Sequence, residues 1–322
     1  MTGGKSIRQK SVYAFPPFFS LSQFFFNHFL SFSCIKFGKE LTVFVICDIM
    51  NPLVNLFIKG EKNMNIFVCI KQVPATNKVQ VDEKTGVLKR NGVMSKMNPY
   101  DLYAVETALR LKEEHGGKVT VGTMGPPQAQ AIIKEAYMMG ADEGYVFSDR
   151  RLGGADVLAT SYTLSQAIQS VGDFDLILCG KQTTDGDTAQ VGPAIAEHMG
   201  IPHAAWVTKL TVSGDGVDAQ QQLQDVIETV HMPFPCLVTV EQDIFMPRLP
   251  SLKIAKEIGN KEIHIQGLDS FLDTDESHYG LSGSPTQVER IFPPDNDTEH
   301  EVWDGEGAAE KLHDQLKKWK FV

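Results

Sequence analysis

Residues 174–199 read FDLILCGKQTTDGDTAQVGPAIAEHM, and their pattern indicates the fold class. It begins with the apolar run Phe174–Cys179, which is typical of a strand covered on both faces of a sheet. It ends with Ala189–Met199, whose apolar residues recur at helical spacing. A strand, a polar loop and a helix in this order form part of a βαβ unit, so the stretch predicts an α/β fold.

The same alternation of strand and helix extends to both sides of this stretch. The further strands that we expect are Ile66–Ile70, Val119–Thr123, Gly144–Phe147 and Leu237–Val240. The further helices that we expect are Pro99–His115 with Asn98 as N-cap, Gln128–Met139 and Asp156–Val171. Repeated units of this length predict a doubly wound, mostly parallel sheet with right-handed crossovers.

Other segments break this rhythm. Val79–Leu88 predicts a hairpin excursion, and three antiparallel strands are expected after Pro202, at Val207–Val212, Gln220–Val226 and Ile227–Val230. From Gly267 the chain is polar and lacks the apolar periodicity of a second core. We therefore expect an α/β domain over residues 64–266 and an arm over residues 267–322, which lies on a partner and ends in an amphipathic helix, Gly307–Trp319.

The first 63 residues differ from the rest. They hold 11 of the 19 phenylalanines, seven basic residues and three acidic ones. Polar residues interrupt their aromatic run, so it lacks the roughly 20 apolar residues of a membrane span, and no signal-peptide cleavage pattern follows it. Codons for Lys59-Gly60-Glu61 can form a purine-rich ribosome-binding sequence shortly before Met64. We therefore expect residues 1–63 to be a translated leader and Met64 to be the true start.

Composition narrows the classes of function. The formal net charge of −10 leaves no basic stripe to neutralise phosphates, which argues against a nucleic-acid-binding protein. The five cysteines form no CxxC pair, and the nine histidines are scattered, so no metal site is expected. Small buried thiols of this kind suit a reducing cytoplasm, and neither a membrane nor a nucleic-acid partner is indicated.

The candidate site follows from the predicted topology. Ligands of such sheets bind at the carboxyl ends of the strands, where Cys69–Pro74, Thr123–Pro127 and Cys179–Gly192 are expected. In the last segment, Gly180 and Gly186 allow close backbone approach, and Asp187 or Thr188 can cap the next helix, whose N–H groups would then face an anion. Spacing alone equally supports a surface loop in which these residues only form turns. Neither the dinucleotide fingerprint nor a Walker A loop is present.

Several segments resemble, in order, those of electron transfer flavoprotein beta subunits: IKQVP, MNPYDLYAVETALRLKE, GPPQAQAIIKEAYMMGAD, GKQTTDGDTAQVGPAIAEHMG and FPCLVTVEQDIFMPRLPSLK. The resemblance covers nearly all of residues 64–322 and implies a Rossmann-like fold of the adenine nucleotide alpha hydrolase kind. It also implies which residues contact the adenine nucleotide: Cys69, Asn98, Pro99, Tyr100, Asp101, Met124, Gly180, Lys181, Gln182, Thr183, Thr184, Asp185, Gly186, Asp187, Thr188, Ala189, Gln190 and Val191.

The resemblance further implies partners and a cofactor. Pro247–Leu252 is similar to the loop that docks on partner dehydrogenases, with Leu252 as its apolar anchor. The sequence DGDTAQVGP resembles the bifurcating type found in anaerobes, whose beta subunit holds FAD, accepts hydride from NADH and supplies ferredoxin and a partner of the acyl-CoA dehydrogenase type. This implies an electron carrier that forms a heterodimer with an alpha subunit.

Two alternatives stay open from the sequence. The first is a beta subunit of the non-bifurcating kind, which holds a structural AMP instead of FAD. The second is a free-standing nucleotide-binding regulator of the universal-stress type, which shares the α/β core. The more than fifty polar residues after the last core strand argue against the second alternative, because a self-contained sensor has no need of them.

Overall fold

The computed structural model describes residues 35–37, 40–42, 63–75, 95–259, 261–288 and 300–322. The chain divides into two units, Met1–Lys62 and Asn63–Val322. In the first unit, β1 (Ile35–Phe37) and β2 (Glu40–Thr42) form an antiparallel pair. Most of the predicted leader and the predicted hairpin Val79–Leu88 lie outside the described residues.

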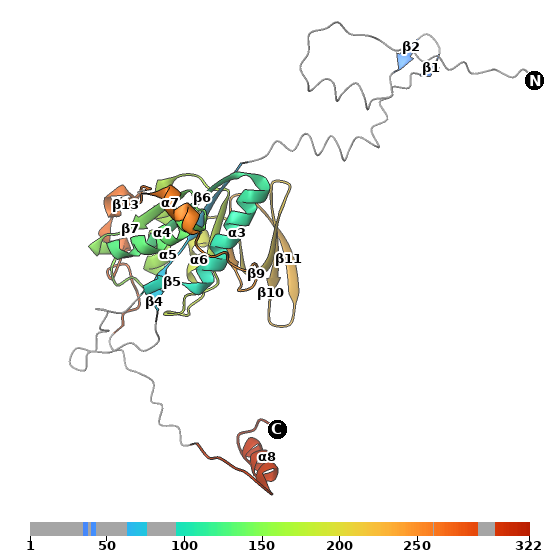
Figure 1. Cartoon of the computed structure of the whole chain (residues 1–322), viewed down its shortest axis with the longest axis vertical. Coiled ribbons are helices and arrows are strands. Elements are labelled where there is room, and N and C mark those ends of the chain that lie inside the picture. Colours follow the sequence, from blue (N-terminus) through green and yellow to red (C-terminus); the bar gives the residue numbers. More distant parts are fainter. Residues whose placement is uncertain (1–34, 38–39, 43–62, 76–94, 260, 289–299) are drawn as a thin grey trace, which may run out of the picture. The chain divides into compact units, whose positions relative to one another are not determined.

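The second unit contains a nine-stranded sheet (Figure 1). Its strands are β3 (Met64–Cys69), β6 (Gly117–Met124), β7 (Glu143–Phe147), β8 (Leu176–Gly180), β9 (His203–Ser213), β10 (Gly216–Gln222), β11 (Ile227–Pro233), β12 (Cys236–Val240) and β13 (His264–Gln266). They are ordered β11-β10-β9-β12-β8-β3-β6-β7-β13, and every neighbouring pair from β9 to β13 is parallel. Only β9–β10 and β10–β11 are antiparallel, so the predicted fold class is confirmed. A separate two-stranded pair joins β4 (Gln72–Pro74) to β5 (Ser95–Met97).

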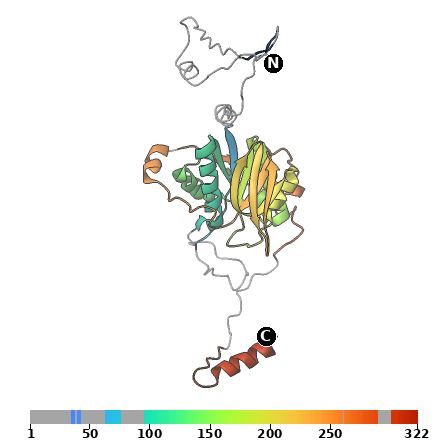
Figure 2. The same cartoon turned by 90° about the vertical axis from the view of Figure 1, so that its right-hand side faces the viewer.

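Helices cover both faces of the sheet (Figure 2). They are α3 (Pro99–His115), α4 (Gln130–Met139), α5 (Val157–Val171) and α6 (Val191–Met199), and α7 (Leu252–Ile258) packs beside α4. A further helix, α8 (Ala308–Lys318), lies near the end of the chain. Successive strand residues point to opposite faces, so Ile66 and Val68 pack with α3 and α4, while Phe67 packs with α5 and α6. The buried strands are apolar on both faces for this reason.

Helix starts agree with the sequence signals only in part. Asp156 caps α5, because its Oδ1 accepts the backbone N–H of Ala159 at 3.1 Å. Asn98 stands at the N-cap position of α3, but its side chain makes no capping hydrogen bond. The segment Pro127–Ala129 forms a 3₁₀ turn, so α4 begins at Gln130, two residues later than predicted.

The antiparallel strands differ from the prediction at one end. The predicted strand Gln220–Val226 is confirmed for Gln220–Gln222 and wrong for residues 223–226, because β10 ends at Gln222 and pairs there with Ile227. Residues 223–226 form the turn, in which the backbone N–H of Leu223 donates to the carbonyl of Val226 at 2.9 Å. Gln224 and Asp225 sit in the middle of this turn, where polar residues favour a reversal over a continued strand.

The start of the predicted arm packs on its own domain. Leu268, Phe271 and Tyr279 are buried in the core layer that contains α5. Polar contacts hold the same segment on the domain. Arg151, which also pairs with Asp149, forms ion pairs with Asp269 and Glu276 of the segment. Tyr162 donates a hydrogen bond to Asp273, and Asp156 accepts one from Thr286. The domain therefore continues past residue 266. Widely spaced apolar residues in a polar stretch gave no periodic signal of this packing.

This packing is tested by replacing neighbours that differ only in burial. Phe271 is 5% exposed and Leu272 is 73% exposed. We expect Phe271→Ala to lower the free energy of unfolding by about 3–5 kcal/mol, because the buried ring leaves a cavity. Leu272→Ala should change it by less than about 0.5 kcal/mol. Urea unfolding of the two variants measures the difference, and equal losses would show that residues 268–284 do not belong to the folded domain.

Candidate functional site

The candidate site lies where the order of the strands reverses. From β3 the chain moves to β6 and β7 on one side, and then returns to β8 on the other side of β3. A crevice for ligands is expected at the carboxyl ends of two strands that diverge in this way. Cys69 ends β3 directly opposite Cys179 of β8, and Gly180 follows Cys179. Met124 ends β6, the next strand along. The structure therefore brings the three predicted strand ends to one edge of the sheet.

Asn98 ties the loop after β8 to the start of α3. Its Nδ2 donates to the carbonyl of Gln182 at 2.8 Å, and its Oδ1 accepts the backbone N–H of Thr184 at 3.2 Å. Both ends of a fully buried amide are thus used on one loop. The predicted capping role of this side chain is wrong, because the loop takes the groups that a helix N-terminus would otherwise use.

Asp101 joins the ends of three elements. Its Oδ2 accepts the backbone N–H of Lys71 at 2.7 Å, just beyond β3, and its Oδ1 accepts from Asn98 Nδ2 at 2.9 Å. A Cβ on Gly180 would stand 2.5 Å from that Oδ1 and 2.6 Å from the carbonyl carbon of Tyr100. Gly180 is therefore required by the close approach of β8 to α3, whereas the sequence prediction gave the approach of a ligand as the reason.

Gly186 has no such internal reason. A Cβ at this position would meet only Thr183 Oγ1, at 3.4 Å, and its backbone conformation is open to other residues. The packing of the described residues therefore leaves free space beside the tip of the loop. Residues 184–188 are all exposed to solvent there.

The two aspartates of the loop are both engaged by side chains. Lys71 Nζ contacts Asp185 Oδ1 at 2.7 Å and Oδ2 at 2.9 Å, and Gln182 Nε2 donates to Asp187 Oδ1 at 2.9 Å. Partial burial would raise the pKa of Asp185, but the Lys71 ammonium outweighs it and lowers that pKa. The carboxylates that would repel an anion at this edge are thus neutralised by partners or turned to a neighbour.

The helix after the loop starts later than predicted. α6 begins at Val191, with Gln190 before it, and no side chain caps its first turn. Neither Asp187 nor Thr188 can cap it, so that prediction is wrong. Asp187 and Ala189 adopt left-handed backbone angles, with φ of 51° and 54°, which turn the chain before the helix starts. The backbone N–H groups of Val191 and Gly192 thus lack a capping side chain, Pro193 has no N–H, and no acidic residue stands in that turn.

Burial controls the titration of the groups beneath the loop. It raises the pKa of Asp101 to about 7, even though Asn98 and Lys71 donate hydrogen bonds to the carboxylate. The hydrogen bond with Cys69 and burial raise the pKa of the Cys179 thiol, so it stays protonated at neutral pH. The site holds no thiolate nucleophile at this position.

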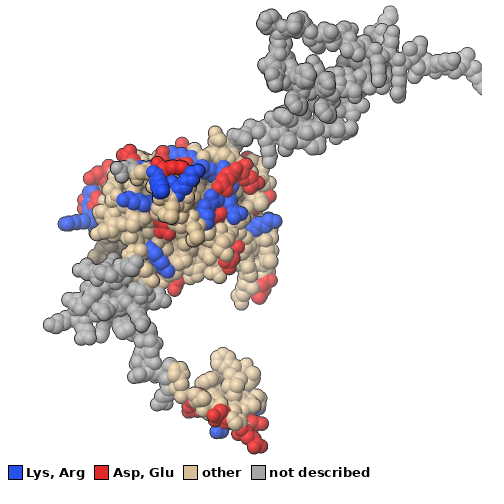
Figure 3. All heavy atoms as spheres, viewed as in Figure 1, with Lys and Arg blue, Asp and Glu red and all other residues tan. Residues whose placement is uncertain are grey.

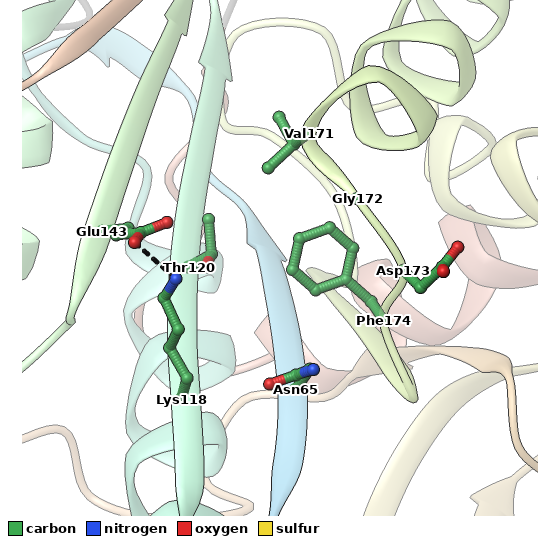
Figure 4. Close-up of a pocket in the computed structure, with 8 residues that line it drawn as sticks. All are labelled: Asn65, Lys118, Thr120, Glu143, Val171, Gly172, Asp173 and Phe174. Carbon is green, nitrogen blue, oxygen red and sulfur yellow. Dashed lines mark ion pairs between the residues drawn. The ribbon is translucent and has the colours of Figure 1, made fainter.

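A hollow lies at the edge of the sheet opposite the candidate site (Figure 4). It is lined by Asn65, Lys118, Thr120, Glu143, Val171, Gly172, Asp173 and Phe174, several of which stand at the amino ends of their strands. Lys118 and Glu143 form an ion pair on its wall. None of the predicted site residues lines this hollow, so it is separate from the candidate site.

The predicted docking segment lies apart from the loop and its network. Leu252 is the first residue of α7 and is 81% exposed. Leu249, 87% exposed, lies within the predicted segment Pro247–Leu252, and Met246, 80% exposed, stands directly before it. The sequence prediction named only Leu252 as an apolar anchor. Apolar residues at every third position among Pro and Arg were the available signal. Basic and acidic side chains gather over α7, where Lys253, Lys256 and Glu257 stand (Figure 3).

The chain is similar to known proteins of one family. The model of the electron transfer flavoprotein domain matches residues 85–266. The electron transfer flavoprotein subunit beta of Thermoanaerobacterium thermosaccharolyticum is 44% identical over 256 residues, which cover 79% of this chain and 98% of that protein. The chain belongs to the electron transfer flavoprotein family, among its beta subunits.

Other members of the electron transfer flavoprotein family match as well. The caffeyl-CoA reductase–Etf complex subunit CarD of Acetobacterium woodii is 43% identical, over 72% of this chain and 88% of that protein. The acryloyl-CoA reductase electron transfer subunit gamma of Anaerotignum propionicum is 40% identical, over 72% of this chain and 89% of that protein. These relatives are named as subunits of electron transfer complexes.

Neither a membrane-spanning helix nor a candidate metal site occurs among the residues that the structure describes. Among the helices in the part of the chain that the structure describes, none is both long enough and apolar enough to span a membrane. The same residues contain no group of three or more His, Cys, Asp or Glu side chains suited to a metal ion.

The raised pKa of Asp101 predicts a pH dependence of stability. Its carboxyl, ordinarily near 3.8, titrates at about 7 in the folded chain, so the folded state keeps a proton that the unfolded state has released. The free energy of unfolding should therefore fall as pH rises from about 4 to about 7, by roughly 4 kcal/mol. Asp101→Asn should remove most of this slope in urea unfolding at a series of pH values.

The control for this experiment is Asp225→Asn. Asp225 is exposed in the turn between β10 and β11, so its replacement removes one carboxyl without touching a buried one. The slope of the control should match that of the unaltered chain. An unchanged slope in Asp101→Asn would mean that Asp101 is ionised throughout this range.

Proposed function

We propose that this chain is the beta subunit of an electron transfer flavoprotein heterodimer and that it holds FAD at the loop Gly180–Val191. The alternative occupant of the same loop is AMP. The proposed heterodimer passes electrons from NADH to a partner of the acyl-CoA dehydrogenase type and to a low-potential acceptor such as ferredoxin, by bifurcation at the flavin. The observation that carries this proposal is the loop at the reversal of strand order, tied down by Asn98 and followed by an uncapped helix.

The residues present fit an adenine dinucleotide. The uncapped N–H groups at the start of α6, aligned with the helix dipole, favour an anion such as a pyrophosphate. Asp185 and Asp187, which would oppose that anion, are held by Lys71 and Gln182. In this proposal the chain fixes the main chain of the loop and presents N–H donors to the nucleotide. It also pairs the Asp185 and Asp187 carboxylates with Lys71 and Gln182, so that they oppose the pyrophosphate less.

Gly186 favours FAD over AMP. Nothing among the described residues requires glycine at this position, and the space beside it is open. A bound group larger than a terminal phosphate would explain why a side chain is missing there. A bound flavin would supply hydride acceptance and one-electron delivery, while this chain would supply position and electrostatics.

The names of two relatives favour a partner that acts on CoA thioesters. One relative is named for a caffeyl-CoA reductase complex and the other for an acryloyl-CoA reductase. The exposed Met246, Leu249 and Leu252 supply an apolar surface for such a partner protein. Exposed apolar side chains grouped in this way are typical of interaction sites.

The occupant of the loop can be measured directly. The family resemblance implies one FAD in the alpha subunit. We therefore expect the purified heterodimer to contain two FAD per alpha–beta pair, counted from the flavin absorbance of acid-released cofactor against the protein concentration. One FAD together with one AMP in the released fraction, identified by chromatography, would refute the bifurcating assignment and support the AMP alternative.

Docking is tested at its proposed anchor. Leu252→Ala removes an exposed apolar side chain, so it should raise the KM for the partner dehydrogenase about tenfold, the size expected for a contact worth roughly 1.4 kcal/mol. The nucleotide content should not change, because Leu252 lies outside the loop network. Leu272→Ala, another exposed leucine, serves as control. An unaltered KM in Leu252→Ala would remove this residue from the docking surface.

A further inference from the structure

The docking segment has no regular structure of its own before α7. Residues 245–251 lie between β12 and α7 and form neither helix nor strand. Yet Met246, Leu249 and Leu252 point outward at regular intervals, each at least 80% exposed. Because this segment lacks the backbone hydrogen bonds of a helix or a sheet, other contacts must hold its side chains in one arrangement. Arg248, which stands between Met246 and Leu249, makes such contacts.

Arg248 forms ion pairs and hydrogen bonds with two carboxylates of α3, those of Glu106 and Glu113. Its Nε donates to Glu106 Oε2 at 2.8 Å, and its backbone N–H donates to the same oxygen at 3.1 Å. Its Nη1 donates to Glu113 Oε1 at 2.6 Å, and its Nη2 donates to both Glu106 Oε1 and Glu113 Oε2 at 3.2 Å. Side chain and main chain of one residue are thus fastened to the same helix.

The carboxylate of Glu106, which pairs with Arg248, is buried and charged. The Glu106 side chain is 2% exposed. Burial alone would raise the pKa of Glu106, but hydrogen bonds from Arg248 and Arg110 more than reverse this and lower it. A buried carboxylate that loses one of its cations becomes costly to keep charged, so the position of Arg248 is strongly specified. The planar guanidinium also matches two carboxylates in a way that an ammonium cannot.

Contacts on either side limit the remaining freedom of the segment. The guanidinium of Arg110 lies over the Phe245 ring, 4.6 Å from its centre. The backbone N–H of Ser251 donates to the carbonyl of Met138 in α4 at 2.9 Å. Arg248 is the central of these three attachments, and it is the one that lies between Met246 and Leu249.

We propose that Arg248 is a positioning residue for partner docking: it holds residues 245–251 in the binding arrangement before the dehydrogenase arrives. This inference rests on the proposed docking function of the segment. A segment that is already ordered binds without the entropic cost of ordering backbone and side chains on association. Glu106 and Glu113 are the groups on α3 through which Arg248 acts.

The test uses Arg248→Gln in the full heterodimer. The partner is an acyl-CoA dehydrogenase-type flavoprotein that accepts electrons from the unaltered heterodimer. We expect the KM for this partner to rise on the order of tenfold while kcat at saturating partner changes less than twofold. Hydrogen exchange of the amides of residues 245–251 should become on the order of tenfold faster in the free heterodimer. A merely structural role would instead lower nucleotide content and kcat together.

Further variants keep the test decisive. Glu113→Gln removes only the exposed carboxylate and leaves Glu106 paired, so it should shift KM and exchange in the same direction by a smaller factor. Arg248→Lys keeps the positive charge but loses the planar guanidinium with its several N–H donors. Its KM and exchange rates should therefore lie between those of the unaltered heterodimer and those of Arg248→Gln. Arg150→Gln removes an exposed arginine elsewhere and should change nothing.

The outcomes separate this inference from the docking proposal. If Leu252→Ala raises KM but Arg248→Gln leaves both KM and exchange unchanged, the positioning role of Arg248 is overturned and docking stands. If neither variant changes KM while Arg248→Gln still speeds exchange, the segment does not dock and the proposed function of this surface fails. Raised KM with faster exchange in Arg248→Gln supports the inference.

Discussion

The site depends on one buried junction, in which Asp101 and Asn98 meet the ends of β3 and β8. Asp101 accepts the N–H of Lys71 after β3, and Asn98 holds the carbonyl of Gln182 and the N–H of Thr184 after β8. These backbone groups have left the sheet ladder, and they need partners because buried polar groups without them are costly. Two side chains from the first turn of α3 meet this need, and in doing so they set the path of the loop.

Much of the fold was predictable from the sequence because it depends on local pattern. Continuous apolar runs and helical spacing mark the core strands and helices, and chain order then limits the topology. The position of Gly180 at a strand end followed from the same reasoning. Long-range pairings were not predictable in this way. Lys71 and Asp185 lie 114 residues apart, and nothing in either neighbourhood indicates that they meet.

The wrong predictions concern residues whose position is decided by contacts with distant parts of the chain. Asn98, Asp187 and Thr188 are residues that often cap helices, but here tertiary contacts and backbone turns take precedence over capping. Residues 268–284 were expected to lie off the core because only a few buried side chains, such as Phe271 and Tyr279, stand among many polar ones. A few buried apolar side chains in a polar segment can be recognised as part of the core only when the surface on which they pack is known.

One helix, α3, connects the loop Gly180–Val191 with the proposed docking segment. Its first turn, at Asp101, supports the loop, and Glu106, Arg110 and Glu113 follow at helical spacing and hold the segment. From Asp101 to Glu113 the helix rises about 18 Å, at about 1.5 Å per residue. A partner bound at the proposed docking segment would therefore be displaced from the loop along a rigid element. Because the two sets of contacts share α3 but no side chain, changes in one should add to changes in the other in their effect on stability. The helix thus fixes the distance between the two sites while it keeps their energetics separate.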